Sequence, residues 1–500
     1  MILTTLNARF THSAIGLRYL YANLHELQQN SQILEFNIND NVNDIAEKLL
    51  EKKPKIIGIG VYIWNALQVA ELVEIIKMIS PDTVIVLGGP EVSYEPFRVN
   101  FDKADFIVQG EGETQFYELC KNILEEKEIE QRVLKAKLQD ITSLKLPYEF
   151  YNDQDIQHRY IYVEASRGCP FKCEFCLSSI DEKVRYFDLD LILEEYEKLW
   201  QKGVRAFKFI DRTFNLNMRY AIAILDFFLS KDEEYFLHFE VIPDSFPSTI
   251  KEKLKLFKPA SLQLEIGIQT LNEDVAHKIN RPLNMAKIEQ NIKFLEEHTN
   301  AHMHLDLIIG LPSESIESFG ANLNKLVSMS SCEIQLGVLK KLSGTSLSRH
   351  DIEYEMKYSS LPPYEILQNS QISYLQMQKL KRFTRFWDLL YNSGNFKNSI
   401  KLLWANKDIY RGFYNFSEWI YIQTDSTWKI SLDRLAELLY NYLTEELSSD
   451  HVSSAKTIFD DIMKHGGRKV PKFLKPFRFE HENHATANKK LLKRQSARAE

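Results

Sequence analysis

Three cysteines stand within eight residues in the stretch Arg167-Gly-Cys-Pro-Phe-Lys-Cys-Glu-Phe-Cys176 of this 500-residue chain. The chain has 5 cysteines in all, and the other two, Cys120 and Cys332, lie far from this stretch. The count is odd, the chain is long enough to bury large cores, and nothing at its start resembles a signal peptide, so a disulfide framework is not expected. We therefore predict reduced thiols and a cytoplasmic protein.

The spacing of the thiols distinguishes two kinds of metal centre. Structural zinc is held by four closed ligands, but no fourth Cys lies near the stretch, and the nearest upstream His, His158, lies outside it. A cubane iron–sulfur cluster with one open iron needs only three thiolates, and the open iron can bind a substrate or cofactor. The sequence favours such a cluster on Cys169, Cys173 and Cys176. A zinc loop in a non-enzymatic binding protein is the alternative.

The same residues carry a family resemblance. C-x3-C-x2-C with an aromatic residue, Phe175, directly before the last Cys resembles the signature of the radical S-adenosylmethionine (SAM) enzymes. The resemblance implies a [4Fe–4S] cluster whose open iron binds SAM, and electron transfer that cleaves SAM to a 5′-deoxyadenosyl radical. It also implies an electron donor such as flavodoxin or ferredoxin. The substrate, a small molecule or a macromolecule, is not identified by any residue.

Residues 1–126 alternate short β-branched runs with amphipathic stretches, which predicts βαβ units and a parallel sheet. Strands are expected at residues 2–5, 33–36, 55–61, 83–87 and 105–108. A helix is expected at residues 66–79, with an apolar stripe of Leu67, Ala70, Val73 and Ile76.

Glycines mark the carboxyl ends of the later strands, at Gly58, Gly60, Gly88, Gly89, Gly110 and Gly112. Ligands bind at this edge of an open α/β sheet, where glycine lets the backbone approach a bulky cofactor. Tight strand-to-helix turns are the other use of such glycines. Together with the radical SAM stretch, residues 1–126 resemble the flavodoxin-like cobalamin-binding domain that precedes the radical SAM core in one branch of the superfamily. The resemblance implies cobalamin over these six glycines.

One motif of that domain is incomplete. Cobalamin domains that ligate cobalt through histidine carry D-x-H-x-x-G, and the matching place here reads Phe10-Thr-His12-Ser-Ala-Ile-Gly16. The Asp that orients the imidazole is missing and the His-to-Gly spacing is one residue too long. We therefore expect His12 to line the site or begin a helix, and not to bind cobalt.

The centre of the chain has the pattern of a second α/β domain. Residues 127–159 are charged and weakly periodic, and are predicted to be a linker. From residue 160 to 347, a helix is expected at 189–202 and strands at 160–164, 206–210, 235–241, 261–268, 302–309 and 333–339. Six such units match the partial (β/α)6 barrel of radical SAM enzymes, in which polar residues at strand carboxyl ends reach the ligand.

Polar strand ends and two family elements supply the candidate SAM contacts. By resemblance, Glu265-x-Gly-x-Gln269 and Asn280-Arg281 match the element that contacts the ribose and methionyl ends of SAM, and Gly310-Leu-Pro312 matches the turn beside the adenine. Carboxylates, amides and Arg suit the ammonium, hydroxyl and carboxylate groups of SAM. A charged strand end is also often only solvated or salt-bridged. The candidates are Phe175, Asp211, Asn215, Glu240, Glu265, Gln269, Arg281, Gly310 and Pro312.

His302 and His304 alternate on one expected strand, as a pair of metal ligands would. Because no third ligand is evident from the sequence, we interpret them as barrel-lining or surface histidines.

Residues 348–465 are rich in Tyr, Phe, Trp and Leu at helical spacing and predict a mostly helical accessory domain. We interpret its aromatic stripe as core; a substrate pocket is the alternative. Residues 354–364, with Pro362-Pro363, resemble the entrance to an accessory region in one branch of cobalamin radical SAM proteins. Residues 466–500 are predicted to be a flexible basic tail.

Charge and composition limit the functional classes. The net charge of −7 argues against a nucleic-acid partner, and no uncharged apolar run is long enough for a membrane helix. The resemblance implies methylation of a substrate carbon radical by methylcobalamin, or another radical modification. RNA methylthiotransferases also pair an α/β domain with a radical SAM barrel, but they need a further cluster on three N-terminal cysteines. Residues 1–126 contain only Cys120.

Overall fold

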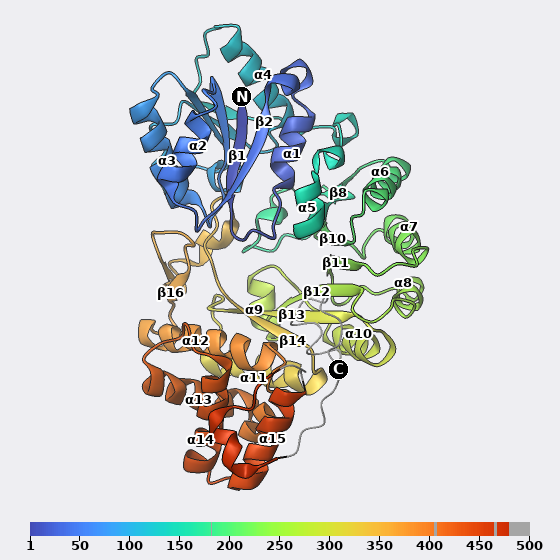
Figure 1. Ribbon diagram of the computed structural model, residues 1–500, viewed down its shortest axis with the longest axis vertical. Helices are drawn as coiled ribbons and strands as arrows, with labels where there is room; N and C mark the ends of the chain where they lie inside the picture. The colour runs from blue at the N-terminus through green and yellow to red at the C-terminus, as the bar shows by residue number, and fades with distance from the viewer. Residues whose placement is uncertain (182, 405–407, 465–467, 480–500) are drawn as a thin grey trace. The chain divides into compact units, whose positions relative to one another are not determined.

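A computed structural model describes residues 1–181, 183–404, 408–464 and 468–479. The chain divides into two compact units, which we describe separately (Figure 1). Unit 1 comprises Met1–Glu240, Lys340–Arg349 and Tyr358–Glu365, and unit 2 comprises Val241–Leu339, His350–Lys357 and Ile366–Glu500.

Unit 1 begins with a six-stranded parallel sheet in the order β2-β1-β3-β4-β5-β6. Its strands are β1 (Ile2–Asn7), β2 (Gln32–Asn37), β3 (Ile56–Gly60), β4 (Val84–Gly88), β5 (Phe106–Gln109) and β6 (Val133–Lys135). The five predicted strands are confirmed, and β6 comes from the segment predicted to be a linker. The strand order reverses between β1 and β3, so a ligand crevice is expected at the carboxyl ends of these strands.

Helices cover both faces of this sheet (Figure 1). One apolar core includes residues of α2 (Val42–Leu50) and α3 (Ala66–Ile79), and the other includes residues of α1 (Ile15–Ala22) and α4 (Glu113–Leu124). The predicted bounds of α3 are confirmed, but one residue of its predicted stripe, Leu67, is wrong, whereas Ala70 is partly buried against the core. Leu67 is 46% exposed, whereas Val69 and Leu72 are buried with Val73 and Ile76. The predicted stripe and the neighbouring row of residues along α3 are both apolar, so helical periodicity alone did not show which of them faces the sheet.

A buried ion network ties the segment 127–159 to this sheet. The segment contains β6, the short turns η3 (Ile141–Ser143) and η4 (Tyr148–Phe150), and α5 (Asp153–His158). The guanidinium of Arg18 lies 2.8 Å from the carboxylate of Glu35 and 2.7 Å from that of Asp155, and Arg159 lies 2.9 Å from Glu35. Burial alone would favour neutral Glu35, but Arg18 and Arg159 together outweigh it and lower the pKa of Glu35.

Removing the central cation of this network should destabilise unit 1. Arg18→Met leaves Asp155 and Glu35 buried with less compensation, so we expect the free energy of unfolding in a urea titration to fall by about 3 kcal/mol. The matched control is Arg434→Met, because Arg434 forms an exposed ion pair with Glu437. This substitution should lower the free energy of unfolding by less than about 1 kcal/mol. Equal losses in the two variants would contradict the prediction.

A second set of parallel strands is divided between the units, with the order β7-β10-β11 in unit 1 and β12-β13-β14 in unit 2. Unit 1 contributes β7 (Ile161–Val163), β10 (Ala206–Phe209) and β11 (Phe236–Val241), with α6 (Leu189–Gln201) and α7 (Met218–Leu229). Unit 2 contributes β12 (Leu262–Gln269), β13 (His302–Ile309) and β14 (Glu333–Val338), with α8 (Ser248–Leu254), α9 (Glu273–Lys278), α10 (Met285–His298) and α11 (Ile316–Met329). All six predicted strands are confirmed, and each pairs in parallel within its unit.

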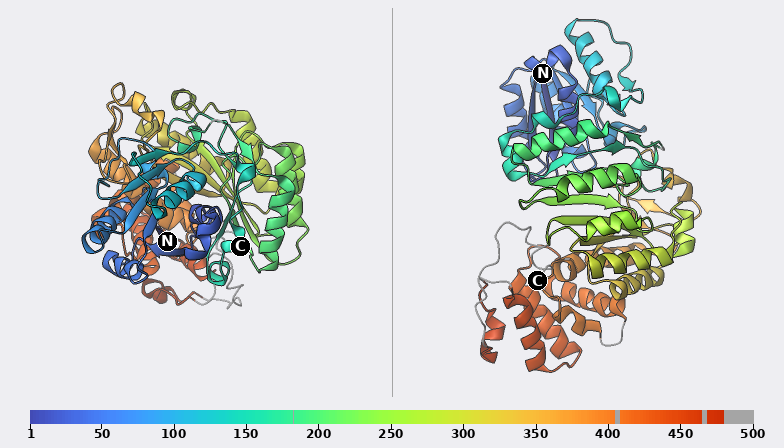
Figure 2. Two further views of the ribbon diagram at one scale, coloured as in Figure 1. Left: turned by 90° about the horizontal axis from the view of Figure 1, so that it is seen from above. Right: turned by 90° about the vertical axis from the view of Figure 1, so that its right-hand side faces the viewer.

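Unit 2 ends in a helical region, as predicted (Figure 2). It contains β16 (Ile366–Gln368), α12 (Tyr374–Trp387), α13 (Ile409–Thr424), α14 (Leu432–Asn441), α15 (His451–Met463) and the turn η10 (Lys472–Phe477). The ring of Phe413 lies 5.2 Å from that of Phe383 and 5.0 Å from that of Trp387, so the aromatic stripe is core. Trp387 also donates a hydrogen bond of 3.1 Å to the carbonyl of Ile334 in β14.

Two further observations concern the membrane and the tail. Among the helices that the structure describes, none is both long and apolar enough to cross a membrane. Most of the predicted basic tail, residues 480–500, lies outside the described residues.

Candidate cofactor site

The cysteine stretch lies between two short antiparallel strands of unit 1, β8 (Ser166–Arg167) and β9 (Arg185–Tyr186). None of the three cysteines forms a disulfide with another described residue; Cys169 and Cys173 are buried and Cys176 is half-buried. The amide of Cys169 donates to the carbonyl of Asp181 at 3.0 Å, and that of Cys176 donates to the carbonyl of Cys173 at 3.1 Å. Three cysteines on one tight loop fit a [4Fe–4S] cluster that leaves one iron open.

The backbone conformation at the start of this loop requires glycine at position 168. Its φ of +92° lies in the left-handed region, and a Cβ atom built on it would lie 2.3 Å from the carbonyl oxygen of Lys183. Any side chain there would therefore displace the backbone on which Cys169 sits.

Asp211, a predicted SAM contact, supports the chain just before this loop. It follows β10 and accepts hydrogen bonds from the amide of Ala165 at 3.0 Å and from the hydroxyl of Ser166 at 2.5 Å. Burial raises the pKa of Asp211 to about 7, although the hydrogen bonds from Ser166 and Ala165 oppose this shift. The side chain thus holds the strand end that leads into the cysteine loop.

The raised pKa of Asp211 predicts a pH-dependent stability. The folded state holds a proton on this carboxyl that the unfolded state loses near pH 3.8, so stability is greatest below that pH. The contribution of Asp211 to the free energy of unfolding should then decrease as the pH rises from about 4 to about 7, and change no further above it. Asp211→Asn should lack this component in urea titrations at a series of pH values. The same pH slope in both proteins would contradict the prediction.

Two other candidate SAM residues of unit 1 follow the same pair of strands. Asn215 is buried after β10. Glu240 lies near the end of β11, where its carboxylate forms an ion pair of 2.8 Å with the largely exposed Arg212. Phe175 is half-buried within the cysteine loop.

All six predicted cobalamin glycines line one cavity of unit 1, of about 290 Å³. A second cavity, of about 590 Å³, reaches Gly168 at the cysteine loop. The two cavities share part of their lining, including Tyr62, Glu111, Glu164 and Arg167. The edge of the first sheet and the start of the cysteine loop therefore border adjoining space within the same unit.

The glycines at this edge of the sheet differ in whether a side chain would fit in their place. Gly89 has a φ of +107°, and a Cβ atom there would lie 2.6 Å from the carbonyl oxygen of Val61, so the turn itself requires glycine. At Gly88, a Cβ atom would meet only the carbonyl oxygen of Val108, at 3.6 Å. Gly88 thus leaves room that the protein does not fill, as a bulky cofactor needs.

Arg167 joins the two loops, and sequence reasoning gave it no role. Its guanidinium lies 2.8 Å from the carboxylate of Glu113 and 3.0 Å from that of Glu164. Arg185 in turn pairs with Glu111 at 2.5 Å and with Asp181 in the cysteine loop. Burial raises the pKa of Glu164, and the guanidinium of Arg167 opposes this shift. Arg167 stands in the cysteine motif and Glu113 follows Gly112, one of the predicted cobalamin glycines, so both partners of this ion pair lie beside local sequence patterns.

His12 lines the second cavity and is not among the residues lining the glycine cavity. Its Nδ1 atom makes a short hydrogen bond with the hydroxyl of Tyr162. Burial, with Lys208 and Arg9 nearby, lowers the pKa of His12, so the ring is neutral at physiological pH.

Unit 2 carries the remaining candidate SAM residues. A Cβ atom on Gly267 would meet the side-chain amide of Gln269 at 2.5 Å and the guanidinium of Arg281 at 3.3 Å. The element Glu265-x-Gly-x-Gln269 therefore brings Gln269 and Arg281 together over this glycine. Glu265 lies half-buried on the same strand, β12.

The predicted adenine turn packs against the C-terminal region of unit 2. A Cβ atom on Gly310 would lie 2.7 Å from Ile366 and 3.2 Å from Met377, and Pro312 is buried. Beyond the turn, Glu314 accepts hydrogen bonds from Thr270 and Asn322, at 2.7 Å each. Burial raises the pKa of Glu314 to about 7, and Glu314 is thus part of a buried structural network.

Family models match three parts of the chain. Residues 1–120 match the B12 binding domain, residues 163–326 match the radical SAM superfamily, and residues 352–500 match a family described as a protein of unknown function (DUF4080).

Individual relatives agree with these matches. An uncharacterized methyltransferase of Pyrococcus horikoshii is 25% identical over 75% of this chain and 84% of its own length. The cobalamin-dependent radical SAM methyltransferase TokK of Streptomyces tokunonensis is 23% identical over 60% of this chain, which spans only 49% of TokK. The structure of the cobalamin-dependent SAM radical enzyme OxsB, with aqua-cobalamin and SAM bound, is similar in fold, with a TM-score of 0.60 and 14% identity over 93% of this chain and 79% of OxsB.

The chain therefore combines an N-terminal B12-binding domain with a radical SAM domain, and its relatives include a cobalamin-dependent radical SAM methyltransferase. The cofactors of this class are a [4Fe–4S] cluster, SAM and cobalamin, and its members need a substrate and an electron donor.

Proposed function

We propose that this enzyme is a cobalamin-dependent methyltransferase that methylates a carbon atom of its substrate. The observation that carries the proposal is the shared lining of the glycine cavity and the cavity at the cysteine loop. When bound, the cluster and SAM would supply a radical that removes a substrate hydrogen atom, and cobalamin would supply the methyl group.

The proposed roles of the residues follow their chemistry. Cys169, Cys173 and Cys176 bind the cluster, and the six glycines at the sheet edge accommodate cobalamin. Arg167, held by Glu113 and Glu164, fixes the cysteine loop against the glycine loop. The residues proposed to contact SAM are Phe175, Asp211, Asn215 and Glu240 in unit 1, and Glu265, Gln269, Arg281, Gly310 and Pro312 in unit 2.

The proposed organisation has five parts: residues 1–126 bind cobalamin, 127–159 connect, 160–347 form the radical SAM core, 348–465 form the helical accessory domain and 466–500 form a basic tail. The electron donor is proposed to be a flavodoxin or ferredoxin, in the reducing cytoplasm where free thiols persist. The substrate is a small molecule or a macromolecule other than nucleic acid, since the net charge is −7.

The alternative of an RNA methylthiotransferase is less well supported. That class needs three N-terminal cysteines, whereas residues 1–126 contain only Cys120. Cys120 is packed in an apolar core, where burial raises its pKa to about 12. A thiol of this kind does not serve as a cluster ligand.

The test is transfer of a labelled methyl group. Protein purified without oxygen and reconstituted with iron, sulfide and cobalamin is incubated with methyl-deuterated SAM, a reductant and a cell extract. We expect a deuteromethylated product, with formation of both 5′-deoxyadenosine and S-adenosylhomocysteine. An unlabelled product formed together with 5′-deoxyadenosine would mean that the reaction is a radical modification other than methylation. A protein that binds zinc in place of iron and sulfide would overturn the enzyme proposal.

A further inference from the structure

Unit 2 contains a group of metal-ligating side chains outside the cysteine loop: His302, His304 and Glu333. His302 and His304 lie two residues apart on β13 and therefore point to the same face of the strand. Glu333 begins β14, and the strand register pairs it with His304. The third ligand that the sequence did not reveal is thus supplied by the neighbouring strand.

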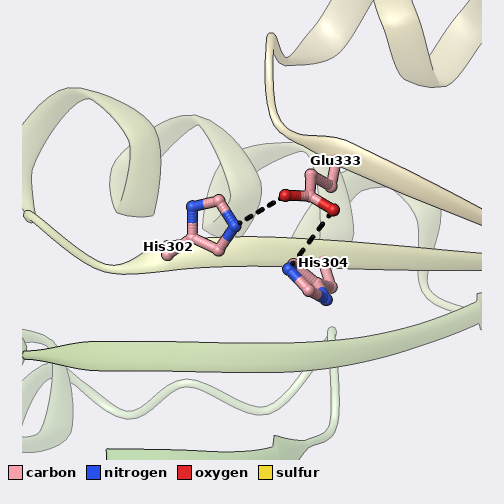
Figure 3. Close-up of side chains that lie close together, drawn as sticks. All are labelled: His302, His304 and Glu333. Carbon is pink, nitrogen blue, oxygen red and sulfur yellow. Dashed lines mark hydrogen bonds and ion pairs between the residues drawn. The ribbon is translucent and has the colours of Figure 1, made fainter. Parts of the chain in front are cut away.

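The two imidazoles converge on the carboxylate, as Figure 3 shows. The Nε2 atom of His302 lies 3.1 Å from one oxygen of Glu333, and the Nε2 atom of His304 lies 3.6 Å from the other. One ligand atom from each residue can be chosen so that all lie within 4.8 Å of one another. Ligand atoms about 2.0–2.1 Å from a tetrahedral zinc ion lie about 3.3 Å apart, and the two nitrogen–oxygen distances, measured to the two different oxygens of Glu333, are close to this value.

Burial favours a cation between these groups. The side chain of Glu333 is 2% exposed, and those of His302 and His304 are 13% and 15% exposed. A divalent ion bound by both rings would neutralise the buried carboxylate. Two imidazoles and one carboxylate are also a ligand set that zinc and other divalent transition metals select.

The surroundings hold one ring in the orientation that metal binding needs. The side-chain amide of Gln335 lies 2.7 Å from Nδ1 of His304, which leaves Nε2 facing Glu333. With a metal on Nε2, the proton is on Nδ1, which then donates a hydrogen bond to the side-chain oxygen of Gln335. The amide group of Gln335 is rotated by half a turn in this state, so that its oxygen faces Nδ1. An outer partner of this kind is usual for metal-binding histidines.

A cavity of unit 2 reaches His302, one of the three side chains. This cavity has a volume of about 230 Å³ and is also lined by Cys332, Tyr391 and Trp404. The group lies at the amino-terminal ends of β13 and β14, whereas the predicted adenine turn Gly310-Leu-Pro312 follows the carboxyl end of β13. Ligands of parallel barrels bind at the carboxyl ends, so this group is separate from the predicted adenine turn, and the candidate SAM residue Glu265 pairs in register with His304 from the neighbouring strand β12.

We propose that His302, His304 and Glu333 form a second metal site, which binds a divalent transition-metal ion such as Zn²⁺ with a fourth position open to water. The bound ion fastens the start of β13 to the start of β14. This inference does not rest on the proposed methyltransferase function, because neither SAM nor cobalamin takes part in it.

The test uses the full-length chain with Cys169, Cys173 and Cys176 all replaced by Ala, so that neither a cluster nor the thiol loop can bind added metal. After chelator treatment, Zn²⁺ binding is measured by equilibrium dialysis, and Co²⁺ is added as a spectroscopic probe. We expect one ion per chain, with visible Co²⁺ bands of a four-coordinate nitrogen and oxygen site and no thiolate charge-transfer band.

Matched variants in the same background assign the site. Glu333→Gln and His302→Asn should each lower the affinity for Zn²⁺ by more than the roughly 10- to 100-fold typical of lost outer partners. The control is His298→Asn, because His298 is an exposed histidine of α10 close to the site in sequence and should leave the affinity unchanged. Circular dichroism identifies a variant that fails to fold, in which case the other ligand variant decides the outcome. Affinity unchanged in a folded ligand variant, or no Co²⁺ spectrum in the parent, would overturn the proposal.

Discussion

Replacing Cys173 with Ala should abolish both the iron–sulfur cluster and the cleavage of SAM. Cys173 is a buried thiol in the middle of a loop that has only three cysteines, so its loss leaves two ligands for a cluster that needs three. Without an open iron, SAM has neither its binding position nor its source of electrons. The iron and sulfide content should fall to background, and so should the formation of 5′-deoxyadenosine, measured by chromatography after anaerobic reconstitution.

The matched control for this variant is Cys332→Ala. Cys332 is half-buried in unit 2, outside the cysteine loop, so its removal should preserve the cluster and SAM cleavage. The Cys173→Ala protein should still retain cobalamin, because no cysteine lines the glycine cavity among the residues that the structure describes. Production of 5′-deoxyadenosine at the wild-type rate in Cys173→Ala would refute the role of this loop.

Much of the fold followed from the alternation of strand and helix patterns. Buried parallel strands are nearly continuous apolar runs, so both sheets stood out from the sequence. The strand β6 (Val133–Lys135) did not, because it is a three-residue edge strand within a charged segment. The ion pairs of Arg18 with Glu35 and Asp155 were equally hidden, since they join segments that are far apart in the sequence.

The candidate sites show the same division between local and long-range signals. The thiols and the glycines were found because each set lies in a local pattern. Glu333 was missed because sequence places His302 and His304 on one face of a strand but does not say which residue of the next strand lies opposite. Arg167 was quoted within the cysteine motif, but its role depends on Glu113, which belongs to the other loop.

A side chain at Gly88 should weaken cobalamin binding and leave the sheet intact. A Cβ atom there meets only the carbonyl oxygen of Val108 at 3.6 Å, and valine is favoured in strands, so Gly88→Val should fold. Its methyl groups would occupy the cavity that the six glycines line. Overpacking of this kind costs about 1–3 kcal/mol, which corresponds to about a 10- to 100-fold loss of affinity. Equilibrium dialysis of the reconstituted protein with cobalamin measures this loss.

The control for this substitution is Gly337→Val, in which a Cβ atom on β14 also meets only a strand carbonyl, that of Leu307, at 3.6 Å. Gly337 does not line the glycine cavity, so this variant should retain cobalamin. Iron and sulfide contents should be normal in both variants, which separates a blocked cavity from general misfolding. Wild-type cobalamin affinity in Gly88→Val would instead mean that these glycines serve only as turns. The backbone at Gly88 tolerates a side chain, whereas that at Gly89 does not. Substitution of Gly88 therefore distinguishes the two roles of these glycines: cobalamin affinity falls if they accommodate the cofactor and is unchanged if they serve only as turns.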